Sequence, residues 1–235
     1  MADHPDVIIN LITFNRLEDA LQTIRSVKEH LVWPNVGWHI ADDGSPEGYV
    51  DQLRAEIGPG YEVTVTNAQP DRIKNGNHQQ VGRNMNLGAK EAFRRADYVL
   101  WLEDDWELKE ELNLGPFVNL LQERSEIGMV RLGYLHLDLE AEILGAANNL
   151  WWLFKRTGHH YTFAGHPSLR HKRFYDCYGG YDEGIDIGAT EDTFCSRFEN
   201  KVDGPGIVWP VWLGERIFYD HFSFSWKVLE SEGKL

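Results

Sequence analysis

The amino-acid sequence predicts an α/β fold with a mostly parallel central sheet flanked by helices. Two observations carry this prediction. Short β-branched and apolar runs alternate with apolar residues at helical spacing through the first half of the chain. The 235 residues are 42% hydrophobic and 26% charged, which is typical of a folded globular protein. Because strands that alternate with helices form parallel sheets with right-handed crossovers, we expect this fold class.

The first expected strand and helix lie near the N-terminus. The run Val7–Ile12 predicts a strand, and the apolar residues that follow at helical spacing predict an amphipathic helix. Asn15 stands at an N-cap position with Glu18 three residues later, so we expect a capping box that starts the helix directly after Asn15. The turn Thr13–Arg16 then lies at the carboxyl end of the strand.

A second unit follows the same order. Gly37–Ala41 predicts a strand, and Ser45 with Pro46 predicts the N-cap and first residue of a helix that ends near Gly58. The later expected elements are Glu62–Thr66 (strand), Asn67–Gln79 (polar loop), Val81–Ala96 (helix), Tyr98–Leu102 (strand), Pro116–Arg124 (helix) and Met129–Leu132 (strand). We find no repeat or linker, and we expect a single domain over residues 1–235.

Charge and cysteine content narrow the function classes. The chain has 23 basic and 37 acidic residues, a formal net charge of −14, and such a surface repels nucleic-acid phosphates and anionic bilayers. Cys177 and Cys195 form no CxxC pattern, which favours a reducing compartment. The sequence has no signal-peptide pattern and no run of about 18 apolar residues, so we expect a cytoplasmic protein without a membrane span.

Three polar clusters follow expected strands, at Thr13–Arg16, Asp42–Ser45 and Glu103–Asp105. In parallel sheets ligands bind at the carboxyl ends of the strands. Three carboxylates after a buried strand are costly unless a cation compensates them, and Mg²⁺ and Mn²⁺ prefer such oxygen ligands. The alternative is a solvated acidic turn. Glu191 and Asp192 form a second acidic pair, for which the alternative is an acidic first helical turn.

In their order along the chain these segments resemble the family-2 glycosyltransferases of the GT-A fold. The resemblance rests on several ordered motifs: Thr13–Arg16, Asp42–Ser45, Asn75-Gly76 with Gly82–Gly88, Leu102–Asp105, Gly179–Glu183 and Thr190–Asp192. It implies a nucleotide-sugar-binding half over about residues 1–105 and an acceptor-binding half over about 106–235. Glu103 replaces the first Asp of the family's Leu-Asp-x-Asp motif.

The resemblance also implies roles for individual residues. Asp105, with His221, would hold Mn²⁺ or Mg²⁺; Asp192 would be the catalytic base, with Glu191 orienting the acceptor or serving as second choice. The residues expected to contact the donor are Thr13, Asn15, Arg16, Asp42, Asp43, Arg83, Glu103 and Asp104.

The implied activity is metal-dependent transfer of a sugar from a nucleotide donor, expected to be a UDP-sugar, to an acceptor hydroxyl. One base without an obvious second carboxylate as nucleophile favours inversion at the anomeric carbon, although Asp182 stays open as that nucleophile. The sequence has no GxGxxG, P-loop or GxSxG pattern, which disfavours dinucleotide oxidoreductases, P-loop NTPases and α/β-hydrolases. A non-catalytic relative that binds sugar nucleotides is the alternative from another class.

The acceptor is left open between a glycan, a lipid-linked sugar, a protein and a hydroxylated base in nucleic acid. The segment Lys155–Arg173 contains five basic residues and no acidic one, so it could bind an acceptor phosphate or be a solvated loop. The candidate acceptor contacts are Trp106, Tyr181, Arg170, Lys172 and Arg173.

Overall fold

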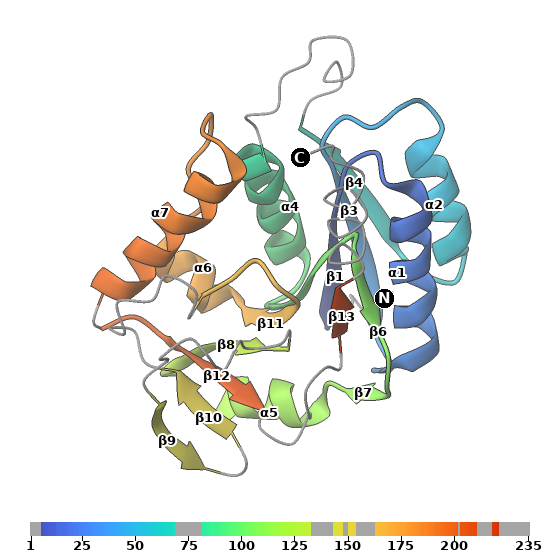
Figure 1. Cartoon of the computed structure of the whole chain (residues 1–235). Coiled ribbons are helices and arrows are strands. Elements are labelled where there is room, and N and C mark those ends of the chain that lie inside the picture. The colour runs from blue at the N-terminus through green and yellow to red at the C-terminus, as the bar shows by residue number, and fades with distance from the viewer. Residues whose placement is uncertain are drawn as a thin grey trace, which may run out of the picture.

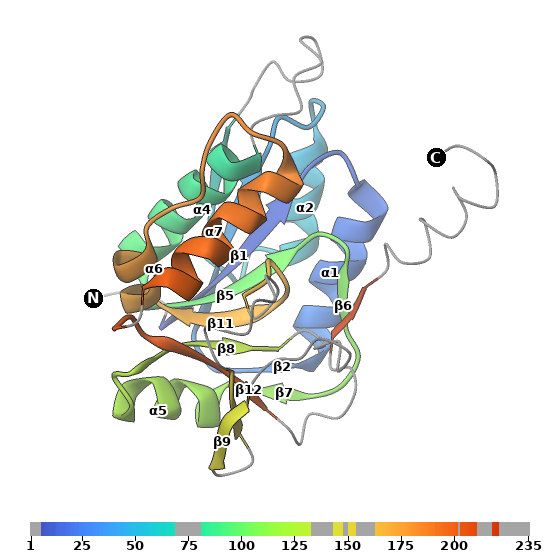
Figure 2. The ribbon, with the colours of Figure 1, turned by 60° about the vertical axis from the view of Figure 1, so that its left-hand side comes forward.

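A nine-stranded sheet with helices on both faces forms the centre of the molecule (Figures 1 and 2). The structure, a computed structural model, describes residues 6–68, 81–132, 143–147, 150–153, 163–201, 203–210 and 218–220. In sheet order the strands are β4 (Val63–Asn67), β3 (Val36–Asp42), β1 (Val7–Thr13), β5 (Tyr98–Glu103), β11 (Ser168–His171), β8 (Ile127–Arg131), β12 (Gly206–Pro210), β10 (Leu150–Leu153) and β9 (Ile143–Ala147).

The expected parallel sheet is confirmed for the first half of the chain. Strand β1 pairs in parallel with β3 and β5, and β3 pairs in parallel with β4. Strand β11 is antiparallel to both β5 and β8 and thereby extends the sheet into the second half. One sheet therefore runs through both expected halves of the chain. Two small additional sheets pair β6 (Trp106–Leu108) with β13 (Phe218–Asp220) and β2 (Leu31–Val32) with β7 (Leu112–Asn113).

The helices cover the sheet in two layers. Helices α1 (Leu17–His30), α2 (Tyr49–Ile57) and α5 (Gly115–Glu123) pack on one face, and α4 (Val81–Arg95), α6 (Lys172–Tyr178) and α7 (Ile187–Asn200) pack on the other (Figure 1). Successive residues of β1 alternate between the two cores, because neighbouring side chains of a strand point to opposite faces. Strand β1 is therefore buried on both faces, as its continuous apolar run predicts.

Most expected elements lie within two residues of the observed ones, but two predictions about helix starts are wrong: the capping box of α1 and the first residue of α2. Helix α1 begins at Leu17 with Arg16 at the N-cap and without a side-chain cap. Asn15 instead adopts the left-handed conformation, with φ of 52°, and its N–H donates to Ser45 Oγ at 2.9 Å. The predicted capping box does not form, because this turn is held by the loop after β3.

The second wrong start is that of α2. Ser45 and Pro46 do not begin the helix, which starts at Tyr49 after Gly48 at φ of 80°. The Ser45 N–H donates to the Asp42 carboxylate and its hydroxyl accepts from Asn15, so Ser45 belongs to the turn that joins β1 and β3. The end of the helix is as predicted, with Gly58 at φ of 90° as C-cap.

Candidate active site

Asp104 joins the ends of β1 and β5. Its side chain is 1% exposed, and its Oδ2 accepts hydrogen bonds from Thr13 Oγ1 at 2.7 Å and from the Phe14 N–H at 3.0 Å. The Thr13 hydroxyl also contacts the Tyr49 hydroxyl from α2. Burial raises the pKa of Asp104 to about 7 against the opposing effect of Arg16. Thr13 and Asp104, which we expected to contact a donor, mainly hold the two turns together.

Arg16 links both acidic residues that follow Glu103. Its guanidinium lies 2.8 Å from Asp104 Oδ1 and 2.8 Å from Asp105 Oδ2. Burial alone would lower the pKa of Arg16, but the two carboxylates outweigh it and raise that pKa. The Arg16 side chain is still 37% exposed, so it can meet an anion from solvent while it pairs with the aspartates.

Asp42 and Asp43 shape the turn after β3. The Asp42 carboxylate accepts from the Ser45 N–H at 3.1 Å and from Asn67 Nδ2 at 3.0 Å. The Asp43 N–H donates to the Thr13 carbonyl at 3.0 Å, so the turns after β1 and β3 are joined by their backbones. Asp42 is therefore used within the turn, whereas Asp43 lines a cavity.

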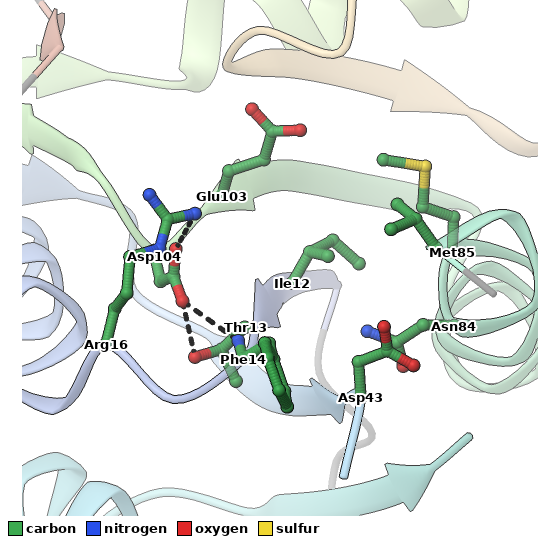
Figure 3. A pocket seen from close by; sticks show the side chains of 10 residues that line it. Ile12, Thr13, Phe14, Arg16, Asp43, Asn84, Met85, Glu103 and Asp104 are labelled. Carbon is green, nitrogen blue, oxygen red and sulfur yellow. Dashed lines mark hydrogen bonds and ion pairs between the residues drawn. The ribbon is translucent and has the colours of Figure 1, made fainter. Parts of the chain in front are cut away.

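This first cavity, of about 190 Å³, lies at the carboxyl ends of β1, β3 and β5 beside the first turns of α4 (Figure 3). The Phe14 ring and the Asp43 carboxylate lie on one side, and Glu103 points away from Asp104 (Figure 3). Residues that line the cavity are Ile12, Thr13, Phe14, Arg16, Asp43, Val81, Asn84, Met85, Glu103 and Asp104. An aromatic ring, a carboxylate and a guanidinium thus share one cavity.

A second cavity, also of about 190 Å³, adjoins the first through Glu103 and Met85, which line both. Residues that line it are Met85, Glu103, Gly165, His166, Tyr181, Thr190 and Glu191. Glu191 Oε1 accepts the Gly165 N–H at 2.6 Å, and a Cβ at Gly165 would lie 3.1 Å from Glu103 Oε1. Burial and the nearby carboxylates of Asp105 and Glu191 raise the pKa of Glu103 well above its usual range.

The acidic pair on α7 is divided between the cavity and solvent. Glu191 is directed inward, and Asp192, the next residue, is exposed. Asp192 is not among the described residues that line either cavity. Cys195, one turn after Asp192, donates from Sγ to the Phe163 carbonyl at 3.4 Å. Asp192 therefore lies on the exposed surface of α7, one turn before this contact.

The expected basic acceptor contacts are not brought to these cavities. Arg170 is 4% exposed, with its guanidinium 4.1 Å from the centre of the Trp101 ring and 3.0 Å from the Tyr181 hydroxyl. His171 pairs with Tyr98, so Lys172 and Arg173 follow β11 at the opposite end of β5 from Glu103. Arg173 donates to the carbonyls at the end of α5, and Lys172 is exposed to solvent. Arg170 and Arg173 thus make contacts within the fold, and none of the three lines a cavity among the described residues.

Of three further expected residues, Arg83 and Trp106 line neither cavity among the described residues, and Tyr181 lines the second. Arg83 is exposed on α4 and is not among the described residues that line either cavity. Trp106 is 2% exposed and packs on His166, with ring centres 5.0 Å apart. Tyr181 lines the second cavity as one wall of an aromatic core. His221, Asn75, Gly76 and the segment 154–162 lie outside the described residues.

Sequence reasoning did not assign several residues that the structure places at the cavities: Asn84, Met85, Gly165 and His166. Asn84 and Met85 lie on α4 where a helical pattern predicts core, and they line the cavity because the first turns of α4 extend past the strand ends. Gly165 could have been predicted from the sequence as a site residue, because glycine permits another group to approach the backbone closely.

Asp105 is the residue of the acidic motif that could offer an oxygen to a cation. Asp105 Oδ1 is buried and makes no hydrogen bond there, while its Oδ2 pairs with Arg16. The described residues contain no cluster of three or more potential metal ligands, so Asp105 would supply one ligand and a phosphate group others. The part of the chain that the structure describes contains no helix long and apolar enough to cross a membrane.

Comparison with solved structures shows the fold. S. aureus TarS, residues 1–349 in complex with UDP-GlcNAc, has a TM-score of 0.63 and 13% identity over 87% of this chain and 55% of that chain. The mannosyltransferase PcManGT from Pyrobaculum calidifontis, in complex with GDP-Man and Mn²⁺, has a TM-score of 0.59 and 15% identity over 89% of this chain and 55% of that chain. The chain thus spans about half the length of each.

These neighbours are glycosyltransferases of the GT-A fold, and the arrangement of sheet and helices is therefore GT-A. No curated protein matches the chain. The family model for glycosyl transferase family 2 matches residues 8–138, which include the turns after β1, β3 and β5 and the acidic motif at Glu103–Asp105. The chain belongs to glycosyltransferase family 2.

Proposed function

We propose that this chain transfers a sugar from a UDP-sugar to an acceptor hydroxyl, with Mn²⁺ or Mg²⁺ and with inversion at the anomeric carbon. The observation that carries the proposal is the pair of adjoining cavities at the carboxyl ends of β1, β3 and β5, in a chain of this family. Arg16 and Asp105 lie beside the first cavity, and Glu191 lies in the second.

The first cavity suits a nucleoside. The Phe14 ring offers an apolar surface to a base, and the Asp43 carboxylate can accept hydrogen bonds from ribose hydroxyls. Arg16 is partly exposed, so its positive charge can attract a diphosphate. The second cavity then receives the sugar, because it continues from the first through Glu103.

Asp105 is the proposed metal ligand within the described chain, with His221 as a further proposed ligand. Mg²⁺ sites typically use one or two carboxylates together with substrate phosphates, which matches one unpaired Asp105 oxygen beside the proposed diphosphate position. When bound, the cation neutralises the negative charge that develops on the leaving diphosphate. Arg16 supports the same charge from the protein side.

Asp192 is the proposed base. The acceptor would arrive from solvent, and Asp192 is exposed and directly follows Glu191 of the second cavity, so we propose that it accepts the proton of the attacking hydroxyl. Glu191 faces inward and accepts the Gly165 N–H, so we propose that it contacts the transferred sugar, in place of the acceptor-orienting or second-choice base role that the resemblance implies. Asp182 is 53% exposed, lies 4.0 Å from Arg197 and is not among the described cavity residues, which supports a single displacement.

The acceptor class is proposed to be a glycan, a lipid-linked sugar or a protein hydroxyl. We do not propose nucleic acid as the acceptor, because the formal net charge of −14 repels phosphates. Arg170 and Arg173 also form hydrogen bonds within the fold.

Calorimetric titration of UDP- and GDP-sugars into the protein, with Mn²⁺ and then with EDTA, tests the function. We expect Mn²⁺-dependent binding of a UDP-sugar, and Asp105→Asn should weaken it while Asp51→Asn, a matched change on the exposed face of α2, leaves it unchanged. No binding under any condition contradicts the proposal. Binding without transfer to any acceptor in a glycan, lipid and peptide panel favours the non-catalytic relative. The anomeric configuration of the product, read by NMR, tests inversion.

A further inference from the structure

His166 occupies the wall of the second cavity and is held from behind by Arg131. The Arg131 guanidinium lies at the end of β8, the residue is 1% exposed, and one of its terminal nitrogens lies 3.0 Å from His166 Nδ1. The imidazole also packs against the Trp106 ring at 5.0 Å with the planes tilted by 52°. Both contacts come from buried residues, so the orientation of the His166 ring is set by the fold.

The contact with Arg131 determines the tautomer of His166. A guanidinium has only donors and stays protonated in proteins. Nδ1 must therefore accept the hydrogen bond, and the ring proton resides on Nε2. Any polar contact that His166 makes with a ligand in the cavity is then made as an N–H donor.

The wall of the cavity next to His166 offers hydrogen-bond acceptors, whereas His166 offers a donor. Gly165, the residue before His166, donates its N–H to Glu191 Oε1 at 2.6 Å, which places a carboxylate beside the imidazole. Glu103 adds a second carboxyl group, and the described residues that line the cavity include no lysine or arginine. The volume of about 190 Å³ lies below the roughly 300–1,000 Å³ of pockets for drug-sized ligands, so the cavity suits one sugar ring.

We propose that His166 is a specificity-determining residue that selects an uncharged sugar with two neighbouring hydroxyl groups. One hydroxyl donates to Glu191, and the oxygen of its neighbour accepts from His166 Nε2–H. A hexuronic acid is rejected, because its carboxylate would face the Glu191 carboxylate without a cation among the described lining residues. This inference rests on the proposed function, which assigns the transferred sugar to this cavity.

The test compares the dissociation constants of UDP, UDP-glucose, UDP-galactose and UDP-glucuronic acid with Mn²⁺ present. The ratio of the UDP value to the UDP-sugar value isolates the contribution of the sugar. We expect His166→Leu to reduce this ratio for the preferred uncharged sugar by about 3- to 10-fold, as for loss of one hydrogen bond, with UDP affinity unchanged. His166→Gln keeps an N–H donor and should retain most of the ratio. UDP-glucuronic acid should bind no more tightly than UDP.

Two results would overturn the inference: an unchanged ratio in His166→Leu, or binding of UDP-glucuronic acid as tight as that of the uncharged sugars. Failure of the wild-type protein to bind UDP refutes the proposed function instead, so the two failures are distinguishable. Nitrogen-15 NMR of the wild-type histidines provides a measurement that needs no variant. We expect the resonance of an unprotonated Nδ1 and a protonated Nε2 for His166, and the reverse tautomer contradicts the inference.

Discussion

Arg16 combines three structural features at the edge of the sheet. It precedes α1, it pairs with Asp104 and Asp105 at 2.8 Å each, and it lines the first cavity. A fixed positive charge beside a metal ligand opposes cation binding, whereas the same charge attracts a diphosphate. If Asp105 holds the cation as proposed, we expect Arg16 to oppose metal binding until the donor arrives with its own negative charge.

Arg16→Gln should separate these two effects. Removal of the guanidinium leaves Asp105 unpaired, so affinity for Mn²⁺ without nucleotide should rise by roughly 3- to 10-fold. Affinity for UDP in the presence of Mn²⁺ should fall, because a donor to the diphosphate is lost. Titration of Mn²⁺ followed by electron paramagnetic resonance, and then of UDP by calorimetry, measures both. Weaker Mn²⁺ binding in the variant would show that Arg16 orders Asp105 rather than competing for it.

Asp192 and Glu191 should differ in the parameter they control. Asp192→Asn removes the proposed base and should lower kcat by about 100-fold or more, with the dissociation constant of the donor unchanged. Glu191→Gln, its neighbour directed into the cavity, should weaken donor binding, because it loses a charged acceptor for a sugar hydroxyl. Steady-state kinetics measure kcat for both variants, and donor titration measures their dissociation constants. If Glu191→Gln lost kcat and Asp192→Asn kept it, the roles would be exchanged.

At the scale of elements, the position of α4 on the sheet sets the shape of both cavities. Met85 from α4 lines both, and Asn84 Nδ2 donates to the Ala41 carbonyl at 2.8 Å. The helix lies close to β1 and β3 at Gly88, where a Cβ would lie 2.8 Å from Ala41 Cβ and 3.0 Å from Asn10 Oδ1. A shift of α4 away from the sheet would therefore move cavity walls.

Gly88→Ala tests this contact. Although alanine favours helix formation, the added methyl has no space, and we expect a loss of about 1–3 kcal/mol in the free energy of unfolding. Gly60→Ala is the matched control, since a Cβ there meets nothing within 4 Å, and its change should stay within about 0.5 kcal/mol. Urea denaturation measures both. Equal effects of the two substitutions would show that α4 can move outward without cost.

At the scale of the whole molecule, stability depends on a buried histidine far from the acidic motif in sequence. His39 in β3 is fully buried, and its ring nitrogens contact Thr64 Oγ1 at 2.8 Å and Thr66 Oγ1 at 3.0 Å in β4. Burial lowers the pKa of His39 to about 4, below the ordinary value of 6.5. The unfolded chain therefore takes up a proton on His39 at a higher pH than the folded protein does.

The sign of the pH effect follows from this difference. Stabilisation from neutral His39 is present above pH 6.5 and is lost as the pH falls from about 6.5 to about 4. Between pH 7 and pH 5 the free energy of unfolding should fall by about 2 kcal/mol more in the wild type than in His39→Gln. Urea denaturation of both proteins at the two pH values measures it. An equal fall in both would contradict the assignment.

Much of the fold could be predicted from the sequence because it follows from local patterns. Apolar periodicity depends on neighbouring residues alone, so β1, β3, β4, α4 and β5 lie where it predicts them. The position of the acidic motif could also be predicted, because charged residues directly after an apolar strand must lie where that strand ends and leaves the core. The capping box at Asn15 was predicted wrongly because a side chain from another segment, Ser45, accepts the Asn15 N–H and holds this turn in another conformation.

The sequence by itself determined the family, the order of strands and helices, and the acidic residues at the sheet edge. Only the tertiary structure decided which carboxylates face a cavity. Among adjacent acidic residues, the orientation of each side chain is set by hydrogen-bond partners that are distant in the sequence. Thr13 and Phe14 engage Asp104, and Gly165 holds Glu191 inward. Likewise, the burial of Arg170 and the Arg131 contact of His166 depend on β11 pairing with β5 and β8, a long-range event that no local pattern encodes.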